Sequence, residues 1–505
     1  MKKITVLLTS LLCLTFLLKL FAAENQDINA VEHPSKALKE NVSETSGSIT
    51  IDGKKVPYKA TAGNIIIKDN QGNPKGSIFY IAYHKDDIQD LKQRPIAFCF
   101  NGGPSCASVW LHLGALGPKR VALTHEGKAI FPYHHEDNEF SLLDVADLVF
   151  VDPISTGYSC VAPGEDAKQF HGVDEDIQSL AQFIRLYTTR TGRWESPKFL
   201  IGESYGTLRA AGLAGLLHND YRMSLNGVIL ISSILDYQTM YNVEVDNDLP
   251  NILYLPSYTA AAWYHKKLPS DLQKKSLAEA VKESEAFAID EYSIALLKGA
   301  SLDKQQREQT IQKLARYTGL SPLVIEKAQM RIDPFQYRKE LLKEDNRTIG
   351  RFDIRFKGID SDACAKYAEY DSSLEELTGI FTAVFNDYAR NQLNWKTDEE
   401  YRTLVSIRNW NYKAANRYLN VAPTLAEVMA KNPNFRVFVA SGYYDLALPY
   451  FTSDYSFNHL GYDGSLLKRV TKKYYEAGHM MFIYRPALIQ LKKDVAGFIL
   501  EANNS

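Results

Sequence analysis

The stretch Phe199-Leu-Ile-Gly202-Glu203-Ser204-Tyr205-Gly206 carries the most information about the fold of this 505-residue chain. An apolar run, 199–201, leads directly into a Gly-x-Ser-x-Gly pattern, and residues 207–217 (TLRAAGLAGLL) form a helix-like segment of small residues suited to close packing. A serine between two glycines on a sharp strand-to-helix turn projects its hydroxyl above a parallel sheet, where a base can reach it. The alternative is a glycine-bounded turn in an ordinary α/β protein, so the pattern needs support from the rest of the chain.

The composition is that of a globular protein. Hydrophobic residues make up 45% of the chain and charged residues 23%, with a formal net charge of -2, which is typical of a packed domain rather than a disordered one. No basic run follows the N-terminus, so we expect neither a nucleic-acid partner nor binding to a membrane surface. The length suffices for a core domain with an inserted second unit.

Residues 1–23 have the pattern of a secretory signal peptide. Met1-Lys2-Lys3 precedes an apolar stretch, 4–18, and Ala22-Ala23 offers a cleavage point. A membrane anchor is the alternative, but Lys19 interrupts the apolar run and leaves it short for a membrane span. We therefore expect an exported protein, periplasmic or secreted, with no stable membrane association after cleavage.

Four cysteines follow this region: Cys99, Cys106, Cys160 and Cys364. In an exported protein they could form up to two disulfides, with three full pairings that the sequence does not separate. Their spacing matches no zinc site, and the adjacent histidines at 134–135 lie in a polar loop of the kind that is usually solvated. We expect no metal and no cofactor.

Short apolar runs alternate with helical stretches along much of the chain. Residues 48–83 predict an antiparallel hairpin or meander, because alternating polarity surrounds a turn rich in Asp, Asn, Gly and Pro. Later apolar runs are 96–100, 148–151, 199–201, 227–231, 436–440 and about 467–475, with helices such as 174–188 between them. This alternation favours a mostly parallel sheet that is covered on both faces.

Long, charged segments with helical periodicity dominate residues 237–408. Examples are 272–286, 303–317 and 321–329, the last opening on a Ser-Pro helix start. We predict a helical insertion at 237–408, which divides a core domain into 24–236 and 409–505. The final stretch, 486–501, predicts an amphipathic helix of the core.

A serine hydroxyl becomes a useful nucleophile only beside a base, which in turn needs an acid to orient it. In the α/β-hydrolase arrangement these follow in the order Ser, Asp or Glu, His, each on a loop after a strand. Asp445 follows the run 436–440, and His479 follows the run that ends near Tyr475. Each alone has a plainer interpretation, a turn-capping carboxylate or a surface histidine. Their order after Ser204 favours a catalytic triad of Ser204, Asp445 and His479.

Acyl transfer also needs two N–H donors for the oxyanion that develops on the substrate. One is expected from the residue after the nucleophile, Tyr205, and the other from an earlier strand-to-helix loop rich in glycine. Asn101-Gly102-Gly103-Pro104 fits that description, and Gly103 is the expected donor. A phosphate-binding loop is the alternative, but the Lys-Ser/Thr of a P-loop does not follow.

Together, five motifs closely resemble the serine carboxypeptidases of the α/β-hydrolase superfamily. They are Phe100-Asn-Gly-Gly-Pro-Ser-Cys-Ala-Ser, Asp152-Pro-Ile-Ser-Thr-Gly-Tyr-Ser, Gly202-Glu-Ser-Tyr-Gly, Gly442-Tyr-Tyr-Asp-Leu and Ala477-Gly-His-Met. The resemblance spans residues 50–500. It implies an α/β-hydrolase fold with a mostly parallel central sheet and a helical cap insertion, and removal of C-terminal amino acids from peptide substrates. It also implies that Asn101, Gly102 and Glu203 recognise the free α-carboxylate. The segment 255–265 looks more like the corresponding segment of bacterial members than that of eukaryotic ones.

Two residues depart from the family pattern. Ser105 occupies the last position of Asn-Gly-Gly-Pro-Gly, and Ala115 stands where a Glu usually precedes Leu-Gly-Pro. In typical members that Glu pairs with the Glu of the strand-to-helix turn that carries the serine (the nucleophile elbow), here Glu203. The two share protons with the substrate carboxylate at acidic pH. We expect weaker binding of the free terminus and an altered pH dependence. Because of Ala115, a second function remains an alternative: a related hydrolase acting as an esterase, amidase or acyltransferase. The intact triad argues against a third alternative, a noncatalytic binding protein.

Overall fold

The computed structural model describes residues 38–241, 246–462 and 464–503. The predicted signal peptide, 1–23, lies outside these residues. The strands of the central sheet are β1 (Val42–Ile51), β2 (Lys54–Lys68), β3 (Pro74–Lys85), β4 (Ile96–Phe100), β7 (Asp147–Val151), β8 (Cys160–Val161), β9 (Lys198–Glu203), β10 (Gly227–Ile231), β13 (Arg436–Gly442) and β14 (Val470–Tyr475). Two small sheets pair β5 (Lys119–Val121) with β6 (His135–Asp137), and β11 (Thr348–Ile349) with β12 (Lys357–Gly358).

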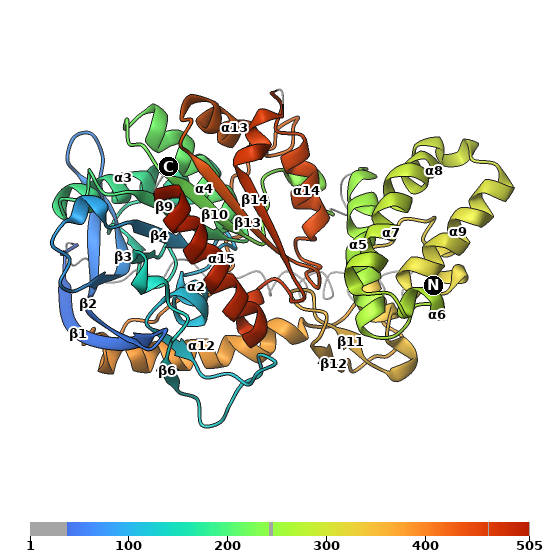
Figure 1. Ribbon diagram of the computed structural model, residues 1–505, viewed down its shortest axis with the longest axis horizontal. Helices are drawn as coiled ribbons and strands as arrows, with labels where there is room; N and C mark the ends of the chain where they lie inside the picture. The colour runs from blue at the N-terminus through green and yellow to red at the C-terminus, as the bar shows by residue number, and fades with distance from the viewer. Residues whose placement is uncertain (1–37, 242–245, 463, 504–505) are drawn as a thin grey trace, which may run out of the picture.

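The central sheet has the order β1-β2-β3-β7-β4-β9-β10-β13-β14, with β8 paired to β3 (Figure 1). Strands β1, β2 and β3 pair antiparallel, as the hairpin signals in 48–83 predict, and β3 also pairs antiparallel with β7. From β7 to β14 every pairing is parallel. The carboxyl ends of β4, β9 and β13 therefore meet at one edge of the sheet, where ligands bind in open α/β sheets.

The helices of the core are α2 (Val109–Leu111), α3 (Val173–Arg190), α4 (Tyr205–Asn219), α12 (Ser372–Asn391), α13 (Ala422–Lys431), α14 (Tyr450–Asn458) and α15 (Arg485–Asn503). Alternate residues of each buried strand serve opposite faces of the sheet, because successive side chains of a strand point in opposite directions. Phe199 and Ile201 of β9 pack in one hydrophobic cluster with α12 and α15. Leu200, between them, packs in a second cluster with α3, α4 and α13. Both faces are thus covered.

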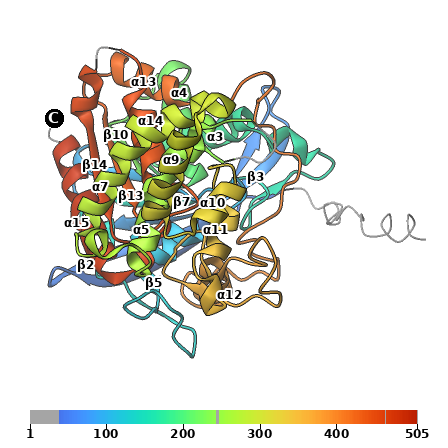
Figure 2. The same ribbon diagram turned by 90° about the vertical axis from the view of Figure 1, so that its right-hand side faces the viewer.

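The helices of the predicted insertion fall into two groups. The first forms the smaller lobe at the right of Figure 1: α5 (Leu249–Tyr264), α6 (Ser270–Gln273), α7 (Leu277–Phe287), α8 (Ser293–Lys298), α9 (Lys304–Thr318), α10 (Pro322–Lys327) and α11 (Pro334–Glu340). Figure 2 looks onto this lobe. The second group is α12 alone, whose Phe381 and Phe385 pack in the core cluster. The boundaries 237–408 stay a prediction.

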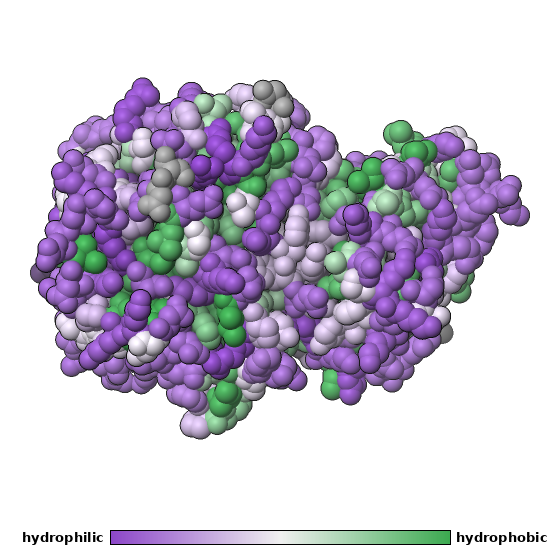
Figure 3. All heavy atoms as spheres, in the orientation of Figure 1, coloured by the Kyte–Doolittle hydropathy of each residue, from purple (hydrophilic) through white to green (hydrophobic). Residues whose placement is uncertain are grey.

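The smaller lobe has a hydrophobic cluster of its own that reaches the core. Tyr444 and Leu446, the neighbours of Asp445, belong to it together with Tyr254 and Tyr258 of α5. In the space-filling view the outline narrows between the two lobes, whose visible surface is mostly hydrophilic (Figure 3). The cap is therefore anchored directly beside the loop that carries Asp445.

Three predictions need correction or refinement. The run 467–475 begins as a 3-10 turn at Ser465–Arg469, and only Val470–Tyr475 is a strand. The predicted helix 272–286 breaks before Ser276, because that side chain and Glu279 form a capping box that starts α7. Disulfides are absent among the described residues, where Cys99, Cys106, Cys160 and Cys364 are all free thiols. Within the described ranges, no helix combines the length and apolar character that crossing a bilayer requires.

Candidate active site

Ser204 lies on the sharp turn between β9 and α4. Its backbone has φ 60° and ψ -131°, a conformation that costs about 1–3 kcal/mol outside glycine and is typical of functional turns. The flanking glycines are required by close packing: a Cβ on Gly202 would lie 2.1 Å from the carbonyl oxygen of Gly206, and one on Gly206 would lie 2.5 Å from that of Phe100. The predicted strand–turn–helix context is therefore present.

His479 and Asp445 meet beside this turn. His479 Nδ1 lies 2.7 Å from Asp445 Oδ2, and the two residues are 2% and 0% exposed. The other oxygen of Asp445 accepts hydrogen bonds from the backbone N–H groups of Ala447 (2.7 Å) and Leu448 (2.9 Å). These contacts fix the carboxylate, so that it can hold the imidazole in one orientation and tautomer.

The imidazole is also held from other directions. The N–H of His479 donates to the carbonyl of Phe352 at 2.6 Å, and the phenyl ring of Phe352 lies 4.8 Å from the imidazole centroid. Burial lowers the pKa of His479, but the charges of Asp445 and Glu203 raise it more, so that the net direction is upward. A proton accepted by this imidazole is therefore stabilised electrostatically.

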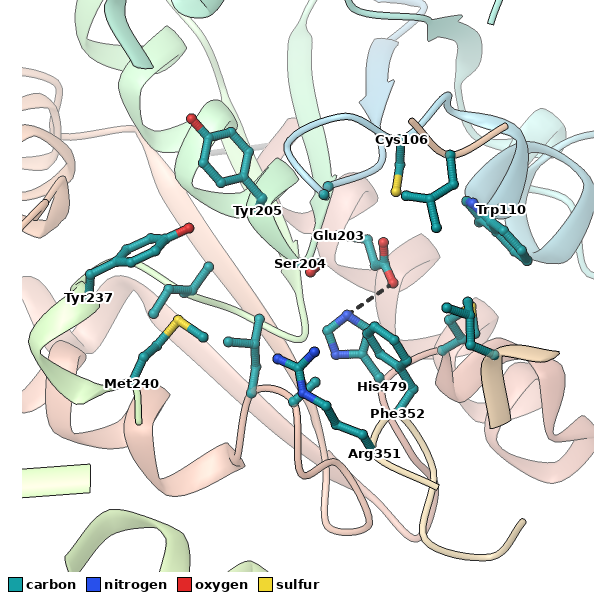
Figure 4. A pocket seen from close by; sticks show the side chains of 18 residues that line it. Cys106, Trp110, Glu203, Ser204, Tyr205, Tyr237, Met240, Arg351, Phe352 and His479 are labelled. Carbon is teal, nitrogen blue, oxygen red and sulfur yellow. Dashed lines mark ion pairs between the residues drawn. The ribbon is translucent and has the colours of Figure 1, made fainter. Parts of the chain in front are cut away.

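Ser204 and His479 line the same cavity, which has a volume of about 230 Å³ (Figure 4). Within the parts of the chain that the structure describes, the Ser204 hydroxyl makes no hydrogen bond to the imidazole, and Nε2 instead lies 3.5 Å from Glu203 Oε1. Catalytic hydrogen bonds are often long in ligand-free enzymes and tighten when substrate binds. The three predicted triad residues thus converge at one edge of the sheet.

Glu203 points into the cavity from the end of β9. It is 5% exposed, and its Oε2 accepts a hydrogen bond of 2.8 Å from Asn101 Nδ2. The amide of Asn101 is itself oriented, because its Oδ1 accepts from the N–H of Leu111 at 2.9 Å. Burial raises the pKa of Glu203, with opposing contributions from His479 and Asn101. A carboxyl group in this environment retains its proton to higher pH than an exposed one.

The loop 101–104 approaches the turn closely. A Cβ on Gly102 would lie 2.5 Å from the nitrogen of Tyr205, and Gly103 has φ +103° with Ser105 N 2.3 Å from the position of its missing Cβ. Only glycine satisfies both conditions without rearrangement. Gly102, Gly103, Tyr205 and Ser204 all line the cavity, so the two predicted N–H donors and the predicted nucleophile border one space.

An ion pair that the motif analysis missed holds this loop from behind. Arg209 on α4 is fully buried and pairs with Asp176 on α3 at 2.7 Å. The same guanidinium donates to the carbonyl oxygens of Asn101 (2.6 Å) and Pro104 (2.8 Å). The sequence signal for this buried arginine is a single positive charge, Arg209, in the otherwise apolar stretch TLRAAGLAGLL. The guanidinium ties both ends of the loop to the helix that follows Ser204.

The two departures from the family pattern have structural consequences. The Ser105 hydroxyl donates to the carbonyl of Val405, and the Val405 N–H donates back to the Ser105 carbonyl at 3.0 Å. Ser105 therefore joins the loop to the segment before α13. Ala115 is 1% exposed and packs in the hydrophobic core. It offers no polar group to Glu203.

Side chains from several elements complete the cavity wall. Besides the residues described above, it includes Cys106, Trp110, Ile234, Tyr237, Met240, Arg351, Phe352, Leu374, Leu404, Ala447, Leu448 and Met480. Arg351 comes from the insertion and has no motif by which the sequence could reveal it. In the described part of the chain, no group of three or more His, Cys, Asp or Glu side chains is arranged to hold a metal ion.

Comparison with known proteins relates the chain to one family. The family model described as serine carboxypeptidase matches residues 51–503. Among curated proteins, serine carboxypeptidase-like 29 of Arabidopsis thaliana is 26% identical over 132 residues, which is 26% of each chain. Carboxypeptidase Y homolog A of Aspergillus oryzae is 27% identical over 177 residues, covering 34% of this chain and 30% of the relative. The aligned segments thus span about a third or less of these relatives.

The fold comparison extends further along the chain. The crystal structure of a prohormone-processing carboxypeptidase from Saccharomyces cerevisiae, KEX1, matches with a TM-score of 0.54 and 16% identity, over 88% of this chain and 91% of that one. At this identity the likeness concerns the fold alone. The predicted α/β-hydrolase fold, with its mostly parallel sheet, is confirmed.

Proposed function

The chain belongs to the serine carboxypeptidase family, and we propose that it is an exported enzyme that releases C-terminal amino acids from peptides through an acyl-enzyme on Ser204. The observation that carries this proposal is the pairing of two features in one cavity. A buried His479–Asp445 pair faces Ser204, and the Glu203–Asn101 pair lies next to them. Export rests on the signal-like sequence of residues 1–23.

In the first half of the reaction, Ser204 Oγ attacks the carbonyl carbon of the last peptide bond. His479 Nε2 accepts the hydroxyl proton and then delivers it to the leaving amine as the bond breaks. Asp445 accepts a hydrogen bond from the Nδ1–H group, so that this proton stays on the imidazole, and its negative charge stabilises the imidazolium. The 2.7 Å contact and the upward shift in the pKa of His479 support this role. Water then attacks the acyl-enzyme, with His479 as general base.

The N–H groups of Gly103 and Tyr205 are the proposed donors to the oxyanion. Their support is the close approach of the loop 101–104 to the elbow and the restriction of that loop by Arg209. Preorganised donors of this kind stabilise charge that develops only in the transition state.

Asn101, Gly102 and Glu203 are the proposed binding site for the substrate's free carboxylate. A Glu donates a hydrogen bond to a carboxylate only while it is protonated, and the approach of a second negative charge favours that form. Burial of Glu203 acts in the same direction. Because Ala115 supplies no second carboxyl group, we expect the affinity for the free terminus to rest on Asn101, Gly102 and one protonatable side chain.

The buried Ala115 also favours one alternative, an α/β-hydrolase acting as an esterase, amidase or acyltransferase without selectivity for a free carboxylate. The test compares kcat/KM for an N-blocked dipeptide with that for its C-terminal amide. Preference for the free acid supports the carboxypeptidase, and equal rates support the alternative. Fluorophosphonate labelling of the wild type and of Ser204→Ala checks the nucleophile: labelling that persists in Ser204→Ala, or is absent from the wild type, contradicts the acyl-enzyme.

A further inference from the structure

Arg351 places a positive charge in the cavity, and this charge has no role in the proposed catalytic mechanism. It follows β11 in the insertion, and its side chain extends along the cavity wall toward His479 and Ser204 (Figure 4). The segment is held in place, because the backbone N–H of Arg351 donates to both oxygens of Asp371, at 3.1 and 3.2 Å. The charge is thus presented to the cavity from an anchored backbone.

Among the described residues, the Arg351 guanidinium has no counter-ion. Among residues 38–241, 246–462 and 464–503, no carboxylate lies within 4.0 Å of it, and its contacts are the rings of Phe335 and Phe352, each 5.5 Å away. The nearby Arg355 differs, since it pairs with Asp353 at 2.6 Å. A guanidinium presents five donors in a planar fork that matches a carboxylate. An unpaired one among apolar walls is therefore suited to an anionic ligand group.

The position of Arg351 indicates which part of a substrate it faces. In Figure 4 the guanidinium and the carboxyl group of Glu203 lie on opposite sides of the His479 imidazole. Trp110 is drawn on the side of Glu203, and Tyr237 and Met240 on the other side. Because Glu203 and Asn101 are the proposed site for the carboxylate of the leaving residue, the opposite side receives the acyl residue.

We propose that Arg351 selects a substrate whose acyl residue, the one immediately before the cleaved bond, carries a carboxylate side chain. The inference rests on the proposed carboxypeptidase function. The side-chain carboxylate of Asp or Glu pairs with the guanidinium through charge-assisted hydrogen bonds. The methylene groups of that side chain contact the apolar wall that Met240 and Leu448 contribute. The preferred substrates are thus peptides that end in an acidic residue followed by one further residue.

The experiment measures kcat/KM for N-blocked Glu-Phe, Gln-Phe and Lys-Phe with the wild type, Arg351→Gln, Arg351→Lys and Arg351→Glu. A charge-assisted hydrogen bond corresponds to a preference of about tenfold or more, so we expect the wild type to favour Glu over Gln by at least that factor at neutral pH. Arg351→Gln should abolish the preference, Arg351→Lys should retain part of it, and Arg351→Glu should favour Lys-Phe. The preference of the wild type should decline as the pH falls through about 4.3, where the substrate side chain is protonated.

Arg347→Gln is the matched control, because it removes the same charge four residues away, from an exposed side chain whose hydrogen bond among the described residues is to the carbonyl of Asn346. It should keep the Glu-to-Gln ratio of the wild type. Equal rates of the wild type on Glu-Phe and Gln-Phe overturn the inference while leaving the carboxypeptidase intact. Loss of the free-acid over amide preference in Arg351→Gln also overturns it, because Arg351 would then bind the terminal carboxylate. Failure of the wild type on every peptide removes both proposals.

Discussion

Removing the charge of Asp176 tests whether the buried arginine behind the elbow positions the oxyanion loop. Asp176 is 2% exposed and accepts hydrogen bonds from Arg209 at 2.7 and 3.3 Å. Asp176→Asn leaves the Arg209 guanidinium buried without an ionised partner. Loss of one member of a buried ion pair costs about 3–5 kcal/mol of unfolding free energy, and we expect a loss of that size here.

The double variant Asp176→Leu/Arg209→Met separates stability from catalysis. Replacing both members of a buried pair with apolar side chains is often neutral, or stabilising by about 1–4 kcal/mol, so its stability should return to the wild-type level or above. The carbonyl oxygens of Asn101 and Pro104 nevertheless lose their donor. A displacement of about 1 Å in a catalytic group costs about 100-fold in rate. We therefore expect kcat/KM to stay about 100-fold below that of the wild type.

Denaturant unfolding gives the stability, and hydrolysis of a blocked dipeptide gives kcat/KM. Asp174→Asn is the matched control: it lies on the same first turn of α3, but in its pair with Lys413 the side chains are 45% and 35% exposed. Exposed pairs contribute roughly 0–1 kcal/mol, so this variant should resemble the wild type in both measurements. The reasoning is refuted if the double variant has wild-type kcat/KM, or if Asp176→Asn loses no more stability than Asp174→Asn.

Three further outcomes are expected. In the pH profile of kcat/KM, Glu203→Gln should move the rising limb to lower pH, because the Glu203 charge helps to raise the pKa of His479. For free-acid peptides it should also remove the falling limb, because an amide donates a hydrogen bond at every pH. Initial rates on free-acid and amide substrates check this, and an unchanged profile contradicts it. Burial raises the pKa of Asp152 from 3.8 to about 7, a difference worth about 4 kcal/mol. Wild-type stability should therefore fall as the pH rises from about 4 to 7; Asp152→Asn should lack this decline, and parallel curves would exclude it. Finally, burial raises the pKa of Cys106 to about 12 while Cys364 is exposed, so a thiol reagent should modify Cys364 first in native protein lacking residues 1–23. All four thiols should react after unfolding without reductant. If only two thiols or none react, the protein contains disulfides.

Most of the scaffold was predictable from local patterns. The runs 96–100 and 227–231 are strands with the predicted bounds, and 436–440 lies within β13, because continuous apolar stretches between turn residues are typical of buried parallel strands. The elbow at Ser204, and the places of Asp445 and His479 after their strands, follow from the same reasoning. Local patterns failed where one residue changed the outcome, as at Ser276, whose capping interaction begins a new helix.

The order of strands and turns along the chain is a property of neighbouring residues, and for that reason the sequence alone predicted the alternating strands and the elbow. The order of Ser204, Asp445 and His479 after their strands, which is that of an α/β-hydrolase, predicted the candidate triad. Only the folded structure decided that Asp176 and Arg209 clamp the glycine loop, and that Arg351 enters the cavity without a counter-ion among the residues that the structure describes. These charges come from separate elements that meet through packing. Their effect depends on distance and burial in three dimensions, which no periodicity or motif in the sequence records.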